Sequence, residues 1–165
     1  DLYGLKVRVM NSQSAFSMIN ALGGAPTPVS WGELYTALQQ GVVDAAENNL
    51  PSFFNSRHYE ICKYYSFDQH TSIPDVLMVS TYLWNSLNEQ EQQWLQEAAN
   101  RSVEYQKQVW ALSVQQCLVK VKKAGVTIYY PEKKPFQMAV SSLYNTYQEE
   151  TELHQLIDEI KNIVK

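Results

Sequence analysis

The sequence predicts an α/β fold in which a mostly parallel sheet is flanked by helices. Two observations support this prediction. Within the first 46 residues the patterns follow the order strand, helix, strand, helix, strand, which is typical of parallel strands joined by crossover helices. Further along, a helical pattern runs unbroken over residues 89–123, much longer than one small domain requires.

The first strand is expected at Leu5–Met10, where apolar and basic residues alternate. A helix should follow over Ser14–Leu22, because apolar residues recur on one side of it and Gly23 and Gly24 come directly after it. Residues 25–29 contain two prolines, so this segment can form only a short edge strand or a loop.

A second helix is predicted over Trp31–Gln40. Ser30 stands before it with Glu33 three residues later, which is the spacing of a capping box. Gly41 follows its last residue, where a helix commonly ends with a glycine. The apolar run Val42–Ala46 then indicates a short buried strand, which we expect to lie parallel to Leu5–Met10 and side by side with it or nearly so.

The middle of the chain has weaker signals. Pro51 opens a helix that we expect to continue to His58. Strands are predicted at Ile61–Ser66 and Val76–Ser80, with irregular backbone over residues 72–75 between them.

The long helix should begin after Asn88, because Glu91 stands at the capping-box position, and end before Gly125. At about 1.5 Å per residue it would extend roughly 50 Å, so it either bridges two lobes or breaks in the middle. A strand at Val126–Tyr130 and a helix from Pro135 to Tyr147 follow. A last amphipathic helix would present one apolar face, made of Leu153, Leu156, Ile157, Ile160 and Val164.

Length and composition indicate one globular core. The chain has 165 residues, of which 45% are hydrophobic and 18% charged. Its net charge of −4 and scattered basic residues exclude the basic stripe of a nucleic-acid-binding protein. No apolar run approaches the roughly 20 residues that span a bilayer. The chain starts at Asp1, without Met or signal sequence, which favours a mature or truncated product.

Cys62 and Cys117 are the only cysteines in the sequence. Two buried free thiols are the favoured interpretation. A disulfide is the alternative, since pairing cannot be read from spacing. Neither residue belongs to a CxxC motif, and His70 and His154 lack nearby Cys or His partners, so no metal site is expected.

A candidate binding site comes from polar residues at predicted strand ends. Arg8 lies inside an apolar run, where a buried charge requires a partner. Asn48 follows the third strand, and a guanidinium and an amide at strand ends suit a small carboxylate. The alternatives are an edge arginine whose head stays in water, and an Asx turn before Pro51. Asn11 is either a turn residue or a ligand contact.

These segments resemble a known family. The motifs are GLKVRVMNS at 4–12, PTPVSWGELYTALQQGVVDAAEN at 26–48 and SRHYEICKYY at 56–65. They are similar to the solute-binding proteins of tripartite ATP-independent periplasmic (TRAP) transporters, which are two-lobed clamps of about twice this length. The resemblance covers nearly the whole chain and implies a periplasmic-binding-protein-like lobe with one long inter-lobe helix.

The resemblance also implies a domain organisation. The chain would be the C-terminal portion of such a clamp. Residues 1–73 and 114–165 would belong mainly to one lobe, and residues 74–113 would contribute to the other.

The resemblance assigns ligand-binding roles to four residues. Arg8 matches the arginine that forms a bidentate pair with the ligand carboxylate. Asn48 matches a ligand-binding asparagine, and Asn11 matches a contact position of some members. Trp31 stands where the family usually has a Phe that lies against the ligand. A tryptophan is more often a core residue than a ligand contact, but the flat indole is also a suitable surface for a sugar ring. Glu47 would repel an anion, yet it would accept a hydrogen bond from a sugar hydroxyl.

The expected function is therefore extracytoplasmic capture of an organic acid and its delivery to a membrane permease, in the periplasm and without a cofactor. The tract at 46–53 resembles sugar-acid binders, which favours a hexuronate over a C4-dicarboxylate. A ligand-sensing domain of a transcriptional regulator is a rival interpretation. An enzyme is not expected: His58, Glu60 and Cys62 lie close in sequence, but no known catalytic motif is present.

Overall fold

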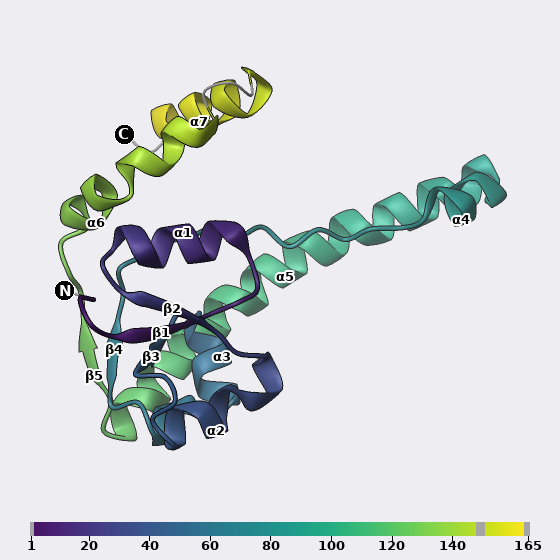
Figure 1. Cartoon of the computed structure of the whole chain (residues 1–165). Helices are drawn as coiled ribbons and strands as arrows, with labels where there is room; N and C mark the ends of the chain where they lie inside the picture. The colour runs from purple at the N-terminus through teal and green to yellow at the C-terminus, as the bar shows by residue number, and fades with distance from the viewer. Residues whose placement is uncertain (1, 148–150, 164–165) are drawn as a thin grey trace.

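The computed structural model describes residues 2–147 and 151–163. It confirms the α/β fold, with two small parallel sheets and helices packed against them (Figure 1). The strands of the first sheet are β1 (Lys6–Val9), β2 (Ala25–Pro28) and β3 (Ala45–Ala46), in the order β2-β1-β3. The second sheet pairs β4 (Tyr64–Ser66) with β5 (Thr127–Tyr129).

The predicted neighbourhood of the first and third strands is confirmed. β1 is the central strand, and Arg8 stands opposite Thr27 on β2 and Ala46 on β3. The proline-containing β2 occupies an edge, as expected, because proline cannot donate to a ladder on both sides. Successive side chains of a strand point to opposite faces, so Arg8 points away from the face that its neighbours present to the first helix.

Glycines end the helices as predicted. Gly23, Gly41 and Gly125 have φ angles of 85°, 70° and 85°, in the left-handed region that L residues avoid. After α2 (Leu34–Gln39), the Gly41 and Val42 N–H groups bond back to the helix at 3.2 and 2.9 Å, a Schellman arrangement. This cap consumes residues 41–42, so the strand expected at 42–46 is shortened to β3.

The predicted capping box at Ser30 is wrong. The Ser30 hydroxyl donates to the Glu33 carboxylate at 2.6 Å instead of accepting from its N–H. The Glu33 N–H bonds to the Ser30 carbonyl at 3.2 Å, which gives a 3-10 turn, η1 (Trp31–Glu33), before α2. The first helix, α1 (Gln13–Ala21), begins close to its predicted position.

The next helix is shorter than predicted. α3 (Leu50–Asn55) ends before His58, because Arg57 adopts a left-handed φ of 61°. A 3-10 turn, η2 (His58–Glu60), follows, and its hydrogen bonds extend to Cys62, so the strand predicted from Ile61 starts only at β4. The N-cap of α3 is Asn49, whose side chain accepts from the Ser52 N–H at 2.8 Å.

The strand predicted at Val76–Ser80 is wrong. These residues pair with no strand in the described part of the chain, and all of them are exposed. A strand needs a neighbouring strand for its N–H and C=O groups, and here none of the described strands lies beside it. The short helix α4 (Thr81–Ser86) follows this segment.

The long helix is continuous. α5 (Glu89–Lys123) has 35 residues, and both hydrogen bonds of the predicted capping box between Asn88 and Glu91 are present, at 3.0 and 2.8 Å. Its buried residues, Cys117 and Val121, lie near its C-terminal end. The N-terminal end projects far from the sheets together with α4 (Figure 1).

The C-terminal segment folds as three short elements. The helix predicted from Pro135 to Tyr147 is divided into α6 (Lys134–Ala139) and the 3-10 turn η3 (Ser141–Tyr147). The amphipathic helix α7 (Thr151–Ile163) forms as predicted. Of its apolar face, Leu153, Leu156 and Ile160 are exposed, while Val164 lies outside the described residues.

The core consists of three apolar clusters. One joins β1 to α1, one surrounds α2, and one packs α3 against the C-terminal end of α5. Cys62 and Cys117 pack within the last cluster, and both are free thiols as expected, Cys117 buried but Cys62 only half-buried. No helix among the described residues is long and apolar enough to cross a membrane.

Candidate functional site

Arg8 is the central residue of the site. Only 4% of its surface is exposed, and its Nε donates to the Val29 carbonyl at 2.9 Å. The alternative of an edge arginine with its head in water is therefore wrong. No carboxylate forms an ion pair with Arg8 within the described residues. A buried charge without an opposite charge is unfavourable, so the Arg8 guanidinium is suited to pair with an anion.

Trp31 lies beside Arg8. The guanidinium carbon is 5.7 Å from the centroid of the indole, a cation–π distance. The indole is 47% exposed, so it is not a core aromatic and one part of it remains free for contact. Its other neighbour is the ring of His58, 5.4 Å away and edge-on.

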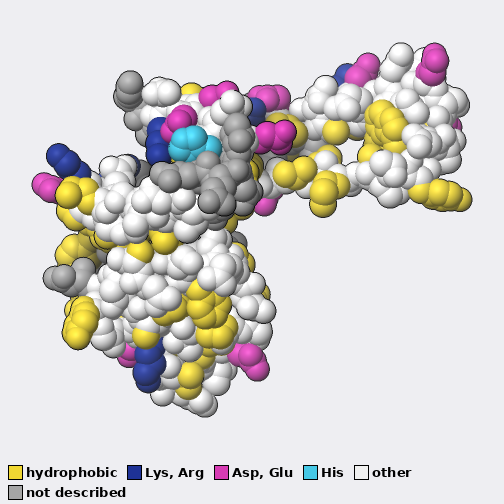
Figure 2. Space-filling view, turned by 45° about the horizontal axis from the view of Figure 1, so that its top comes forward, with side chains coloured by type: hydrophobic (Ala, Val, Ile, Leu, Met, Phe, Trp, Pro, Cys, Tyr) yellow, Lys and Arg dark blue, Asp and Glu magenta, His cyan; other side chains and the backbone are white. Residues whose placement is uncertain are grey.

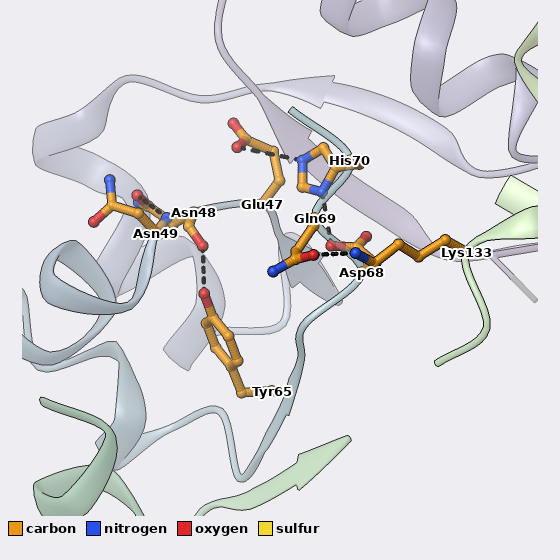
Figure 3. Close-up of polar contacts among 8 residues, drawn as sticks. All are labelled: Glu47, Asn48, Asn49, Tyr65, Asp68, Gln69, His70 and Lys133. Carbon is orange, nitrogen blue, oxygen red and sulfur yellow. Dashed lines mark hydrogen bonds and ion pairs between the residues drawn. The ribbon is translucent and has the colours of Figure 1, made fainter. Parts of the chain in front are cut away.

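Asn48 is the second residue after β3 and lies at the carboxyl end of the sheet. Its side-chain oxygen accepts from the Asn49 N–H at 2.9 Å, so the Asx-turn interpretation is partly right. Its amide nitrogen makes no hydrogen bond within the described residues and is available for a ligand. The backbone carbonyl of Asn48 accepts from the Tyr65 hydroxyl at 2.9 Å (Figure 3). Burial raises the pKa of Tyr65 to about 12, which keeps this phenol protonated.

Asn11 also follows a strand, since β1 ends at Val9. It is exposed and lies in a bend in which the Ser12 N–H bonds to the Met10 carbonyl at 2.8 Å. The structure thus places Asn11 at the same edge of the sheet as the predicted site, in a turn. Its role as a ligand contact stays a prediction.

His70 is a site residue that the sequence reasoning missed. Its Nδ1 bonds to Asp68 at 2.8 Å, and its Nε2 faces Glu47 at 3.8 Å, too long for a hydrogen bond but close enough for an ion pair (Figure 3). The bond to Asp68 and the nearness of Glu47 raise the pKa of His70 from 6.5 to about 9. The imidazole is therefore a cation at neutral pH, and it lies between the carboxylates of Asp68 and Glu47.

A small pocket of about 170 Å³ lies next to this cluster. Asp68, Gln69, His70 and Lys133 line its polar side, and Lys133 bonds to Gln69 (Figure 3). Its other walls come from α1, α6 and the turns beside them: Met18, Leu22, Phe136, Gln137, Val140 and Tyr144. Pockets for small molecules typically measure about 300–1,000 Å³. This pocket is smaller, and it is lined neither by Arg8 nor by Asn48.

The residues considered for catalysis face different partners. His58 packs on Trp31 and Tyr35, while Glu60 accepts from the Tyr35 hydroxyl at 3.1 Å and from Arg57 at 2.8 Å. Burial raises the pKa of the Cys62 thiol, which makes it a poor nucleophile. These contacts do not place the Cys62 thiol and the His58 imidazole as a nucleophile and its base. Among residues 2–147 and 151–163, no group of three or more His, Cys, Asp or Glu side chains is placed to hold a metal ion.

Comparisons with known proteins match nearly the whole chain. The family model for bacterial extracellular solute-binding proteins, family 7, matches residues 1–151. A solute-binding protein of Chromohalobacter salexigens is 40% identical over 164 residues, which are 98% of this chain and 49% of that protein.

Two similar solved structures contain a sugar acid. The first is a TRAP periplasmic solute-binding protein of Chromohalobacter salexigens with bound D-glucuronate, with a TM-score of 0.94 and 40% identity over 98% of this chain and 55% of that one. The second is a TRAP periplasmic solute-binding protein of Xanthobacter autotrophicus with bound β-D-galacturonate, with a TM-score of 0.92 and 40% identity over 98% of this chain and 54% of that one. The chain thus spans about half the length of these relatives.

Proposed function

Because the chain belongs to the bacterial extracellular solute-binding proteins of family 7, we propose that it forms the C-terminal part of a periplasmic protein that binds a hexuronate and delivers it to the membrane permease of a TRAP transporter. The observation that carries this proposal is Arg8, a buried guanidinium with no carboxylate partner among the described residues. The carboxylate of a sugar acid supplies that partner.

Each predicted site residue has a role in the proposal. The Nε of Arg8 is held by Val29, so its two terminal nitrogens remain for a bidentate pair with the carboxylate. The exposed part of Trp31 offers an apolar surface to the sugar ring, and the amide nitrogen of Asn48 donates to a ring substituent. Asn11 would contact the ligand from the turn after β1.

Glu47 selects for hydroxyl groups in this proposal. A lone carboxylate would repel an anionic ligand, but the His70 cation facing it reduces that repulsion. Glu47 can then accept a hydrogen bond from a sugar hydroxyl. A C4-dicarboxylate without hydroxyls would leave this acceptor without a partner, which favours a sugar acid. The hexuronates bound in two similar structures support the same choice.

The second half of the pocket would come from another lobe. Residues 74–113 contribute to it in this proposal, and their exposed apolar side chains would pack on chain that lies outside this sequence. Figure 2 shows hydrophobic side chains along the arm that α4 and the N-terminal part of α5 form. The most exposed large ones among residues 73–94 are Ile73, Val76, Leu77, Met78, Tyr82 and Trp94. Closure of two lobes buries the ligand, and the contacts formed only in the closed state drive it.

Two rival functions remain distinguishable. A ligand-sensing domain of a regulator would share the clamp but act without a permease, and fluorescence microscopy of a tagged full-length protein would locate it in the cytoplasm. An enzyme is the second rival. The proposed function includes no catalysis, so turnover of D-glucuronate by the full-length protein would contradict the proposal.

The test of the proposed function is the variant Arg8→Lys in the full-length protein. Lysine keeps the charge but loses the planar fork, and each lost hydrogen bond to a charged group is worth about 1.5–3 kcal/mol. Calorimetric titration with D-glucuronate should therefore show at least about a tenfold loss of affinity. The bond to Val29 would also be lost, so we expect a drop in unfolding free energy of about 1 kcal/mol.

Arg57→Lys is the matched control, because Arg57 is 70% exposed and a lysine at this position keeps the charge that pairs with Glu60. Its affinity should equal that of the wild type. Equal affinity in Arg8→Lys would remove Arg8 from the site. Binding of succinate in preference to D-glucuronate would overturn the sugar-acid assignment and leave the carboxylate site standing.

A further inference from the structure

His58 is a buried polar residue that none of the roles above includes. Only 4% of its surface is exposed. It begins the turn η2 directly after Arg57, whose left-handed φ of 61° reverses the chain there. An L residue adopts this conformation at a cost, so the turn is maintained by what its side chains contact.

The ring of His58 lies between two aromatic rings from another part of the fold. The Trp31 indole is 5.4 Å away with an interplanar angle of 69°, and the Tyr35 ring is 6.4 Å away with an angle of 31°. Edge-on aromatic pairs at such distances are favourable beyond the area that they bury. His58 therefore attaches η2 to η1 and α2 through these two rings.

Tyr35 is itself fixed on its far side. Its hydroxyl donates to Glu60 at 3.1 Å, and Glu60 is also paired with Arg57 at 2.7 Å. These bonds close a loop of contacts around His58, because Glu60 and Arg57 flank it in the same turn. The imidazole thus has a supported position, whereas the indole on its other side is 47% exposed.

Without the His58 ring, few groups would hold the Trp31 indole in place. Its neighbours among the aromatic and cationic groups of the described residues are His58 and Arg8. Burial lowers the pKa of His58 below its ordinary 6.5, and the charge of Arg8 lowers it further. The imidazole is therefore neutral at neutral pH, so among the described residues Arg8 is the cation that the indole faces.

We propose that His58 is a positioning residue that fixes the plane of the Trp31 indole, and through it the guanidinium of Arg8, for binding of the sugar acid. The inference rests on the proposed function for its ligand. His58 acts through Trp31 and makes no contact with the ligand. It therefore determines how well the platform and the carboxylate clamp are aligned with each other.

The first test needs no ligand. Near-ultraviolet circular dichroism reports how rigidly an aromatic ring is held, and the difference between the wild type and Trp31→Ala isolates the signal of Trp31. In the full-length protein, His58→Ala should lose most of this signal, and His58→Phe, which keeps a ring at the same place, should retain it. The control Tyr59→Ala, which removes a ring stacked on Phe54 in the neighbouring core, should also retain it.

The second test is a double-mutant cycle with D-glucuronate. His58→Ala alone should lower the affinity about three- to tenfold, and His58→Phe should restore most of it. In the Trp31→Ala background, His58→Ala should cause no further loss, because its route to the ligand is already absent. Tyr59→Ala should destabilise the protein and leave the affinity unchanged.

Independent, additive losses from His58 and Trp31 would overturn the inference, as would an unchanged Trp31 signal in His58→Ala. An equal loss of affinity in Tyr59→Ala would also overturn it, because that result reduces His58 to general stability. Failure of the wild type to bind D-glucuronate would contradict the proposed function instead, and the dichroism experiment would still decide whether His58 positions Trp31.

Discussion

We expect the substitution His70→Gln to destabilise the protein strongly at mildly acidic pH and only weakly at alkaline pH. The imidazole is 19% exposed and lies 2.8 Å from Asp68 and 3.8 Å from Glu47, and these carboxylates raise its pKa from 6.5 to about 9. The folded state therefore binds this proton more tightly than the unfolded state does. The resulting stabilisation is fully present below the unfolded pKa of 6.5 and is lost as pH rises through about 9.

The structure also sets the magnitude. A rise from 6.5 to about 9 corresponds to about 3 kcal/mol, at about 1.4 kcal/mol per pKa unit. Solvent reaches part of the side chain and screens the two carboxylates, so we expect about 2 kcal/mol. Glutamine can still bond to Asp68 but carries no charge, so only the pH-dependent part of the stability should disappear.

Chemical denaturation at about pH 6 and about pH 10 measures this difference. His154→Gln is the control, because His154 lies on α7, is 44% exposed and stands 3.6 Å from Asp158. The free-energy gap between the wild type and His70→Gln should shrink toward alkaline pH, while that of the control stays small at both values. A gap of equal size at both pH values would refute the reasoning. So would an NMR titration in which His70 titrates near its ordinary pKa.

Two further substitutions test local features of the fold. Tyr65→Phe should lower the unfolding free energy by about 1 kcal/mol, because the Asn48 carbonyl loses its hydrogen-bond donor. Tyr64→Phe on the same strand is the control: Tyr64 is 71% exposed, so its substitution should have little effect in the same denaturation experiment. Gly41→Ala should lower the unfolding free energy by about 1 kcal/mol because of its φ of 70°, although nothing lies within 4 Å of an added Cβ. The control Gly32→Ala also has open space but no positive φ, so it should cause no loss of stability. Equal melting temperatures for the two variants would contradict the role of the left-handed cap.

Features decided by a few adjacent residues were predicted well. The glycine ends at Gly23, Gly41 and Gly125 and the capping box of Asn88 with Glu91 were all correct. In each of these, the sequence neighbours are also the hydrogen-bond partners, so the pattern contains the whole interaction. Ser30 failed despite the same spacing, because its hydroxyl donated to the Glu33 carboxylate and the first turn tightened to 3-10 geometry.

Features that require distant partners were predicted less well. The segment Val76–Ser80 has the composition of a strand, but an extended chain becomes a strand only beside another one, and no described strand is available to it. In contrast, β1 and β3 were correctly placed side by side, because a short strand–helix–strand–helix–strand order leaves few arrangements.

The candidate site shows the same difference between features set by sequence neighbours and features that depend on distant residues. Arg8 and Trp31 were selected from the sequence, and the fold brings them within cation–π distance. His58 was considered for catalysis with its sequence neighbours Glu60 and Cys62, and His70 was judged by its lack of nearby Cys or His partners. Their actual partners are an indole 27 positions away in one case, and Asp68 with Glu47 in the other. The Asp-x-His spacing at 68–70 was the one local signal, and a search that included carboxylates would have found it.

Within the proposed function, the position of Arg8 determines which ligand contacts could close the clamp and which could not. A guanidinium with 4% exposure and no carboxylate partner in the described residues raises the free energy of the ligand-free state. In the proposed function, the carboxylate of a sugar acid would relieve that cost through contacts made on this lobe alone. Such contacts are equally strong in the open and closed states, so they cannot by themselves shift the balance between the two. Closure must therefore be driven by the groups of the ligand that Arg8 does not bind. The ligand hydroxyl groups that we propose to bind Glu47 and Asn48 are suited to this task, since they would lie at the same edge of the sheet and could also contact a second lobe. We therefore expect affinity to depend mainly on Arg8, and discrimination among sugar acids to depend on the hydroxyl contacts that are completed on closure.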